Sequence, residues 1–82
     1  MTHELKCYPE YYDAVADGSK PFELRYDDRG YAVGDTLLLR RYDPLAGGYT
    51  GETMRRRVTY VLRGGLWLTP GYVALGLGDD PA

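Results

Sequence analysis

The sequence predicts a small α+β domain, mainly β, in which five strands and one short helix follow the order β-α-β-β-β-β. Three observations carry this prediction: segments of alternating polar and apolar residues, one helical stretch that begins at a Pro, and Gly-rich turn sequences. A chain of 82 residues holds one hydrophobic core, so we expect a single domain over residues 1–82. One short helix cannot cover both faces of an open five-stranded sheet, and we therefore expect closure into a small barrel.

The first two expected elements are a strand at residues 2–7 and a helix that follows it. The strand is predicted from its alternation of apolar and charged residues. Pro9 is expected to open the helix and Gly18 to close it as a C-cap. The side chains expected to face the core are His3, Leu5 and Cys7 from the strand and Tyr12, Val15 and Ala16 from the helix.

The second strand is expected at residues 22–27, where alternation indicates a half-buried strand with an ionic outer face. Its inward side chains are predicted to be Phe22, Leu24 and Tyr26, and its outward side chains Glu23, Arg25 and Asp27. Turn residues at 28–30 and 33–35 then lead into a third strand at 36–42.

The last two strands are predicted on either side of Gly-containing breaks. Residues 43–51 contain three Gly and one Pro, which indicates a hairpin loop before a return strand at about 52–62. The register of that strand stays open, because either Val58 and Tyr60 or Thr59 and Val61 could face inward. A final strand at 72–77 is expected to turn Val73, Leu75 and Leu77 inward.

Charge is divided unevenly along the chain, although the net charge is only -2 and the pI about 5.2. Residues 1–35 carry net -4, residues 36–78 net +4 and residues 79–80 net -2. The basic cations of the middle segment are all Arg, whose planar fork matches phosphate. We expect phosphate contacts from Arg40, Arg41, Arg55 and Arg57. The alternative is that these are solvated positions that protect sheet edges.

Several classes of site are not expected from the composition. Cys7 is the single Cys, so no intrachain disulfide can form, and this usage is typical of a reducing compartment. Together with His3 it falls short of four zinc ligands, and neither a metal nor a cofactor is expected. No apolar run approaches the about 20 residues of a membrane span, and the first residues do not fit a signal peptide. We therefore expect a cytoplasmic protein with no membrane partner.

The densest group of functional residue types follows Gly18. Lys20, Glu23 and Arg25 bring a donor and an acceptor toward one space, an arrangement that can read the Watson–Crick edge of a base or serve acid–base chemistry. The alternative is a surface ladder of ion pairs, Lys20–Glu23 and Arg25–Asp28, each worth little. Trp67, between Gly and Pro residues, is the aromatic residue best placed to stack on a base at a cleft mouth.

Motifs along residues 3–77 resemble the small ASCH-like proteins of bacteria and phages, in a branch of the PUA-like superfamily classed as a domain of unknown function. The matching segments are His3 to Lys6, Pro9 to Tyr12, Gly18 to Arg25, Asp28 to Asp35, Arg57 to Gly64 and Pro70 to Leu77. The resemblance implies a small β-barrel with a helix beside a cleft. It also implies binding of RNA or of a modified nucleotide in that cleft. The expected ligand-binding residues are His3, Lys6, Lys20, Glu23, Arg25, Arg29 and Trp67.

Two other functions stay open. Some ASCH relatives are amidohydrolases that act on N4-acylated cytidine with a Lys, a Thr three residues later and a distant Glu. Lys20 matches the first position, but Glu23 stands at the second and no acid lies between Glu52 and Asp79. If the domain is an enzyme, Lys20 and Glu23 are its expected catalytic residues, although these departures favour binding without hydrolysis. The third possibility is a protein-interaction module.

Overall fold

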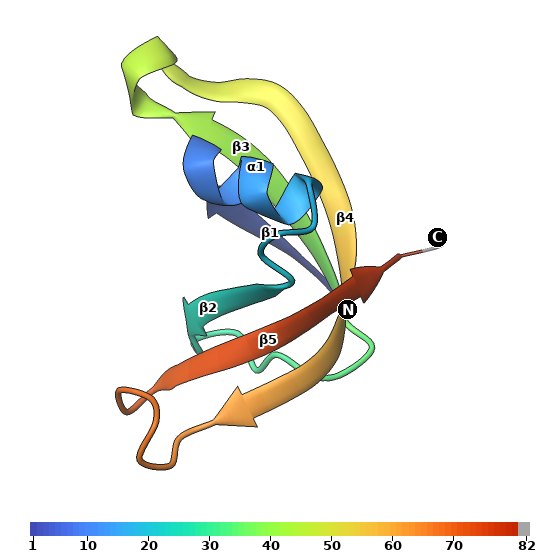
Figure 1. Cartoon of the computed structure of the whole chain (residues 1–82), viewed down its shortest axis with the longest axis vertical. Coiled ribbons are helices and arrows are strands. Elements are labelled where there is room, and N and C mark those ends of the chain that lie inside the picture. Colours follow the sequence, from blue (N-terminus) through green and yellow to red (C-terminus); the bar gives the residue numbers. More distant parts are fainter. Residues whose placement is uncertain (81–82) are drawn as a thin grey trace.

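The computed structural model describes residues 1–80 and has the expected order of elements (Figure 1). Five strands, one α-helix and one 3-10 turn are present in this part of the chain. They are β1 (Thr2–Cys7), α1 (Pro9–Ala16), β2 (Phe22–Tyr26), β3 (Thr36–Asp43), η1 (Pro44–Ala46), β4 (Gly48–Arg63) and β5 (Tyr72–Asp79). The prediction of a mainly β domain with one short helix after the first strand is thus confirmed.

The five strands form one sheet in the order β1-β3-β4-β5-β2, with β1 and β3 parallel and the other pairs antiparallel. The long strand β4 curves through the molecule and carries the sheet around into a half-barrel, with α1 beside it (Figure 1). Backbone pairing does not close the described sheet, because β1 and β2 stand at its two ends. The expected barrel is therefore a curled half-barrel.

The core lies inside this curl. It consists of Leu5, Cys7, Tyr12, Val15, Tyr31, Leu37, Leu39, Val58, Val73 and Leu75. Ala16, which was predicted to join the helix stripe, is exposed. Ala16 is the last residue of α1 and Gly18 turns the chain at φ 87°, so no further helical turn continues the buried stripe past Tyr12 and Val15.

The open register of β4 is resolved by a β-bulge. Val58 pairs with Leu77 and Tyr60 pairs with Gly76, so Thr59 is an extra residue in the ladder. Val58 is buried before the bulge and Val61 packs against the core after it. Each of the two predicted alternatives was therefore half right, because the inserted residue reverses the alternation midway along the strand.

The β3–β4 connection is tighter than the predicted loop at 43–51. β3 continues to Asp43 and β4 begins at Gly48, with only the 3-10 turn between them. The Asp43 carboxylate accepts a hydrogen bond from the Leu45 N–H at 2.9 Å, and Gly47 turns the chain at φ 91°. Because of these local bonds, both strands run into the segment 43–51, whose Gly and Pro residues had predicted a loop.

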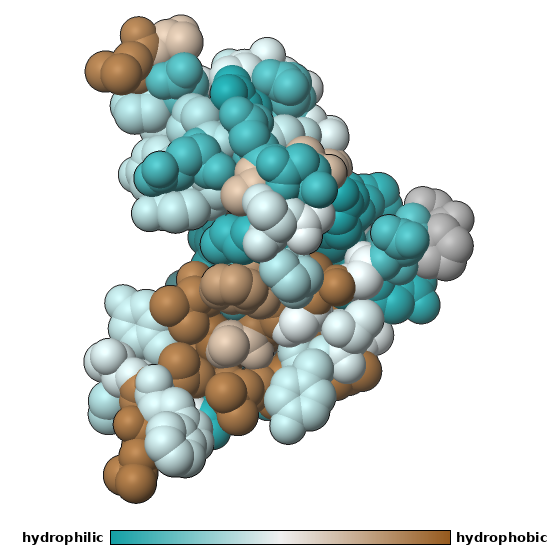
Figure 2. Space-filling view, viewed as in Figure 1, coloured by the Kyte–Doolittle hydropathy of each residue, from teal (hydrophilic) through white to brown (hydrophobic). Residues whose placement is uncertain are grey.

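The two faces of β2 are reversed from the prediction. Glu23 is only 3% exposed, whereas Phe22, Leu24 and Tyr26 are 45%, 51% and 58% exposed. Arg25 and Asp27 are half-buried. Figure 2 shows apolar residues gathered on the surface of the half-barrel formed by β2, β4 and β5, while hydrophilic residues cover the part around α1. The ionic face can turn inward because its charges find partners there.

Candidate ligand pocket

A hollow of about 500 Å³ opens between the end of β1, the start of α1 and the strand β2. In Figure 2 it lies on the side where a notch separates the α1 half of the molecule from the β2 half. A volume of this order is typical of sites for small molecules. The lining residues are Lys6, Cys7, Tyr8, Tyr11, Lys20, Phe22, Glu23, Leu24, Arg25, Tyr26 and Tyr72.

The pocket lies along an unpaired strand edge. The N–H of Asp27 donates to the Gly71 carbonyl and the N–H of Leu77 donates to the Pro21 carbonyl, so the odd-numbered residues of this segment point their backbone groups toward β5. The backbone N–H and C=O groups of Phe22 and Leu24 and the N–H of Tyr26 must then point to the opposite, free edge of β2, while the Tyr26 carbonyl accepts the Asp28 N–H at 3.0 Å. A ligand in the pocket would meet backbone donors and acceptors as well as side chains.

A buried carboxylate stands at the centre of the polar wall. Glu23 accepts hydrogen bonds at 2.9 Å on each oxygen, from Lys20 Nζ on Oε1 and from Arg25 Nε on Oε2. Lys20 is held in place by the helix end, because its N–H donates to the Ala14 carbonyl. The sequence placed these three residues together. The structure joins them as one buried cluster in the pocket wall, whereas the alternative was a ladder on the outside.

Two Arg side chains bridge the gap between the free edges of the half-barrel. Arg25 Nη2 donates to the Lys6 carbonyl at 2.8 Å, and Arg29 Nη1 donates to the Glu4 carbonyl at 2.9 Å. These carbonyls belong to the edge of β1 that faces away from β3. The guanidinium groups therefore satisfy backbone acceptors that a closed barrel would pair with another strand.

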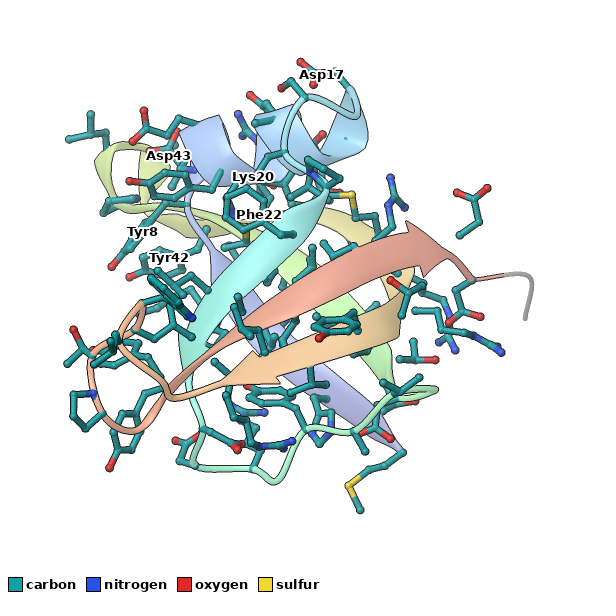
Figure 3. The ribbon with its side chains drawn as sticks, turned by 60° about the horizontal axis from the view of Figure 1, so that its bottom comes forward. Tyr8, Asp17, Lys20, Phe22, Tyr42 and Asp43 are labelled. Atoms are coloured by element: carbon teal, nitrogen blue, oxygen red, sulfur yellow. The ribbon has the colours of Figure 1, made fainter. Side chains whose placement is uncertain are left out.

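Aromatic rings and cations surround the polar wall. Lys20 Nζ lies 5.4 Å from the ring centroid of Tyr11 and 5.1 Å from that of Phe22. Figure 3 shows Lys20 and Phe22 at the start of β2, with Tyr8 and Tyr42 beyond them. Tyr26 and Tyr72 form an edge-to-face pair with centroids 5.6 Å apart on the other side. The mouth of the pocket thus offers exposed rings beside positive charges.

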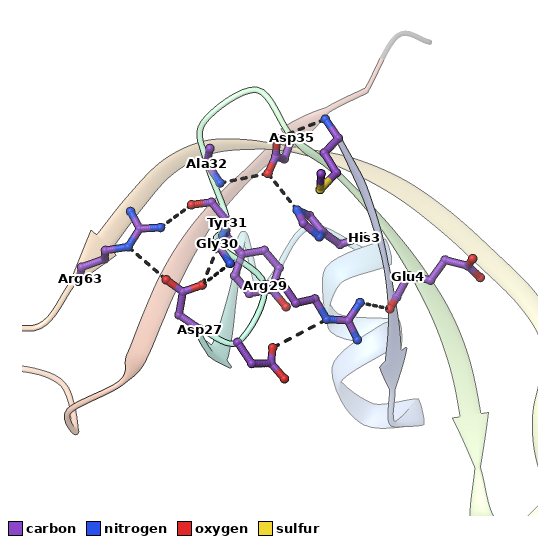
Figure 4. Close-up of polar contacts among 11 residues, drawn as sticks. His3, Glu4, Asp27, Arg29, Gly30, Tyr31, Ala32, Asp35 and Arg63 are labelled. Carbon is purple, nitrogen blue, oxygen red and sulfur yellow. Dashed lines mark hydrogen bonds and ion pairs between the residues drawn. The ribbon is translucent and has the colours of Figure 1, made fainter.

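His3 lies outside the lining of the pocket. It is buried, and its Nε2 atom is 2.9 Å from Asp35 Oδ2 (Figure 4). Asp35 also accepts the Ala32 N–H at 3.0 Å and lies 3.3 Å from the N-terminal amine. The hydrogen bond from His3 has the largest effect on the pKa of Asp35 and lowers it. Desolvation opposes this effect, and the bonds from Ala32 and the N-terminal amine lower the pKa further. Asp35 therefore fixes the turn at 32–35 and also ties β1 to that turn.

Arg29 also lies outside the lining, beside a second set of turn contacts drawn in Figure 4. Asp27 accepts hydrogen bonds from the N–H groups of Gly30 and Tyr31 and from Arg63 Nε. Desolvation opposes these bonds, but on balance they lower the pKa of Asp27. Arg63 also donates to the Tyr31 carbonyl. This network holds the 27–35 connection, which follows the pocket strand β2, against β4.

The four arginines expected to contact phosphate differ in their partners, although the register places Arg40, Arg55 and Arg57 on one face of the β3–β4 ladder. Arg55 and Arg57 each lie within 3.5 Å of the buried Asp80 carboxylate. Arg41 lies 3.2 Å from Asp13 of α1 and 3.6 Å from Glu52. Arg40 has only a distant acid partner, Glu4 at 4.0 Å, and lies over the ring of Tyr49.

Trp67 borders a second, smaller hollow of about 220 Å³. Its other lining residues are Leu24, Leu68, Thr69 and Tyr72. Leu24 and Tyr72 line both hollows, so this site continues the first. Trp67 is 77% exposed and lines this smaller hollow, not the pocket of Lys20, Glu23 and Arg25.

Sequence reasoning missed most of the aromatic lining. Tyr8, Tyr11, Phe22, Tyr26 and Tyr72 all line the pocket but had been assigned to the core or to no role. Nine Tyr in 82 residues is more than this small core uses, and that excess was the available signal. Cys7 was expected in the core and is there, with one wall on the pocket; burial, followed by the nearby Glu23 carboxylate, raises the pKa of its thiol.

Among residues 1–80, no group of three or more His, Cys, Asp or Glu side chains could hold a metal ion. Within the same range, no helix has the length and apolar character to cross a membrane.

Fold and site define a class: a small, mainly β half-barrel with one helix and an aromatic-rimmed polar pocket beside it. Residues 2–77 match the model of the family described as "Domain of unknown function (DUF3850)", and the chain belongs to that family. The match confirms the broader part of the resemblance, a domain of unknown function.

A phage relative supports the same assignment. The "Uncharacterized 12.9 kDa protein in GpA 3'region" of Escherichia phage P2 is 39% identical to this chain over 66 residues. The alignment covers 80% of this chain and 59% of the relative. The chain therefore spans less than two thirds of the length of that protein.

Proposed function

We propose that this domain is a PUA-like module that binds a nucleobase, in RNA or in a free or modified nucleotide, within the pocket between β1 and β2. One observation carries the proposal: a buried carboxylate, Glu23, held by Lys20 and Arg25 at 2.9 Å, forms the wall of a pocket rimmed by exposed aromatic rings. The curled half-barrel with a helix beside a hollow fits the ASCH-like resemblance and supports it further.

The polar wall suits the hydrogen-bonding edge of a base. Glu23 Oε1 accepts one hydrogen bond, from Lys20, and has a further lone pair for a base N–H, whereas Oε2 lies 2.9 Å from both Nε and Nη2 of Arg25. Lys20 has donors beyond the one that it gives to Glu23, and these can meet a ring nitrogen or carbonyl. The free edge of β2 adds backbone donors and acceptors. The wall therefore presents fixed groups of both kinds to a planar ligand.

The rim suits the flat face of a base. Tyr26 and Phe22 are about half exposed at the pocket, although large apolar side chains are normally buried. Stacking of a base on an aromatic side chain contributes about 1–3 kcal/mol and tolerates any base. Exposure of these rings is costly in a free domain and useful in one that stacks on bases.

Binding without turnover is the favoured form of the proposal. The described pocket lining contains no Ser or Thr hydroxyl that could replace the Thr of the amidohydrolases. The one thiol, Cys7, is 3% exposed and its pKa is raised by burial, which disfavours the nucleophilic thiolate.

The test is a calorimetric titration with cytidine, N4-acetylcytidine, uridine, adenosine and guanosine 5′-monophosphates. At least one should bind, and Glu23→Gln and Tyr26→Ala should each weaken it about 10-fold, a loss of about 1.4 kcal/mol. Tyr60→Ala is the matched control, because Tyr60 is 64% exposed but is not among the pocket residues. It should bind as the unmodified protein does.

Two outcomes would replace this function. Conversion of N4-acetylcytidine to cytidine that disappears in Lys20→Ala would establish the amidohydrolase. No binding of any base, with a stable protein complex recovered after nuclease treatment, would establish the protein-interaction module.

A further inference from the structure

A cluster of rings and cations lies next to the pocket where β1 and β3 end. Tyr42 packs edge-to-face on Tyr49, with centroids 5.0 Å apart, and on Tyr8, with centroids 6.1 Å apart. Lys6 Nζ lies 4.6 Å from the Tyr42 ring and Arg40 lies 3.9 Å from the Tyr49 ring. We call these five residues the cationic cluster. Lys6 and Tyr8 also line the pocket, so the cluster and the pocket are continuous.

A second group of rings continues the pocket on its other side. Tyr26 and Tyr72 form a pair at 5.6 Å, and Tyr72 also lines the smaller hollow with Trp67. We call these three residues the Trp67 cluster. The pocket therefore lies between two aromatic groups, each of which shares residues with it.

We propose that the natural occupant is a single-stranded segment of nucleic acid, with one base in the pocket and its neighbours on the two clusters. This inference rests on the proposed function and names the form of its ligand. A free nucleotide would use only the pocket, and nothing in its chemistry would account for exposed rings on both sides. A single strand presents successive base faces, which aromatic side chains bind in sequence.

Charge favours this occupant over an apolar peptide. Lys6 and Arg40 are cross-strand neighbours in the β1–β3 register, and each lies over the face of a ring; Lys6 lines the pocket and Arg40 lies beside it. Arg40 has only Glu4 at 4.0 Å as an acid partner, so a phosphate can compete for it. Such a combination of rings and cations is what proteins use to hold the bases and backbone of a single strand.

The ion pairs of the arginines indicate which of them can contact phosphate. Arg55 and Arg57 share the carboxylate of Asp80, whose side chain is fully buried, and Arg41 faces α1 through Asp13. Phosphate contact is therefore assigned to Lys6 and Arg40. Arg55 serves as the matched control, since its side chain is 43% exposed and that of Arg40 is 40% exposed.

The test measures affinity against length, with mono-, di-, tetra- and octanucleotides of one base in RNA and DNA form. Fluorescence anisotropy at 50 and 200 mM salt gives the affinity and its salt slope. Affinity should rise at least 10-fold from the mononucleotide to the tetranucleotide, and a duplex of the same sequence should bind more weakly because its bases are paired. The RNA and DNA arms decide which backbone is preferred.

Variants of residues in the two clusters test whether these clusters cause the higher affinity for longer nucleotides. Tyr49→Ala should reduce tetranucleotide binding toward the mononucleotide level and leave mononucleotide binding unchanged, because Tyr49 lines neither hollow, and Trp67→Ala should also reduce tetranucleotide binding. Arg40→Gln should lower the salt slope by about 0.7, the value for one phosphate contact of a single strand, and Arg55→Gln should not. Equal affinity at every length would overturn this inference and leave the nucleobase pocket standing. Failure of all lengths, the mononucleotide included, would overturn both.

Discussion

Replacement of Glu23 by Gln removes the charge that both Lys20 and Arg25 contact while keeping the size of the side chain. Hydrogen bonds to charged groups contribute about 1.5–3 kcal/mol each, so two bonds set an upper range of about 3–6 kcal/mol. Lys20 and Arg25 keep 19% and 25% of their side-chain surface exposed, and water recovers part of this loss. We therefore expect Glu23→Gln to reduce the free energy of unfolding by about 2–3 kcal/mol.

Urea denaturation followed by circular dichroism measures this change. For a domain of this size it corresponds to a fall of roughly 10–20 °C in Tm. Glu52→Gln is the control, because Glu52 is 61% exposed at its 3.6 Å pair with Arg41 and should lose less than about 0.5 kcal/mol. A loss as small as this control in Glu23→Gln would refute the idea that Glu23 holds the polar wall together.

Three further outcomes are expected. Gly71→Ala should cost about 2 kcal/mol or more in thermal unfolding and Gly30→Ala about 1, because both have positive φ but only at Gly71 would a Cβ lie 2.6 Å from the Tyr26 ring; equal losses would contradict this packing. The pKa of Asp35 is lowered by its bond to His3, so the native state binds fewer protons than the unfolded chain. Its contribution to stability is present above the ordinary value of 3.8 and disappears as pH falls through the lowered pKa. The urea midpoint should fall there, and by less in Asp35→Asn. Burial raises the pKa of the Cys7 thiol, so a thiol reagent at pH 8 should label the native protein slowly and the urea-unfolded chain fast; rapid native labelling would speak against a closed core.

Local signals were sufficient for the order of elements and for most of the core. Pro9 begins the helix and Gly18 follows its end, and both act on the helix without contacts to distant residues. The alternation at β1 and β5 also identified the buried faces, because Leu5 and Cys7 of β1 and Val73, Leu75 and Leu77 of β5 meet the core as predicted. The bulge at Thr59 is different. It depends on Gly76 and Gly78 of another strand, where a Cβ would lie within 3.1 Å and 2.8 Å of the Thr59 side chain.

The inversion of β2 shows the limit of periodicity. Alternation indicated that the two faces differ, and the usual rule assigned the apolar face to the core. Glu23 faces inward because Lys20, from the helix end, and Arg25 neutralise it there. Periodicity within one strand contains no information on such partners.

The polar residues of the site were foreseen together and the aromatic residues were not. Lys20, Glu23 and Arg25 lie within six residues, so their proximity could be read along the chain. Tyr8, Tyr26 and Tyr72 come from distant segments, and only the half-barrel topology brings them to one pocket. Arg40, Arg55 and Arg57 share one face of the β3–β4 ladder, and their acid partners distinguish them, Glu4 for Arg40 and Asp80 for the other two.

The most direct test of the nucleobase pocket is an NMR titration of the ¹⁵N-labelled domain with nucleoside monophosphates. Shifts should concentrate in the amides of Leu24 and Tyr26 on the free edge of β2 and in those of Lys6 and Tyr8 across the pocket, and Glu23→Gln should need about 10-fold more nucleotide to show them. Shifts confined to the segment around Arg55 and Arg57, or no shifts with any base at millimolar concentration, would contradict the nucleobase pocket.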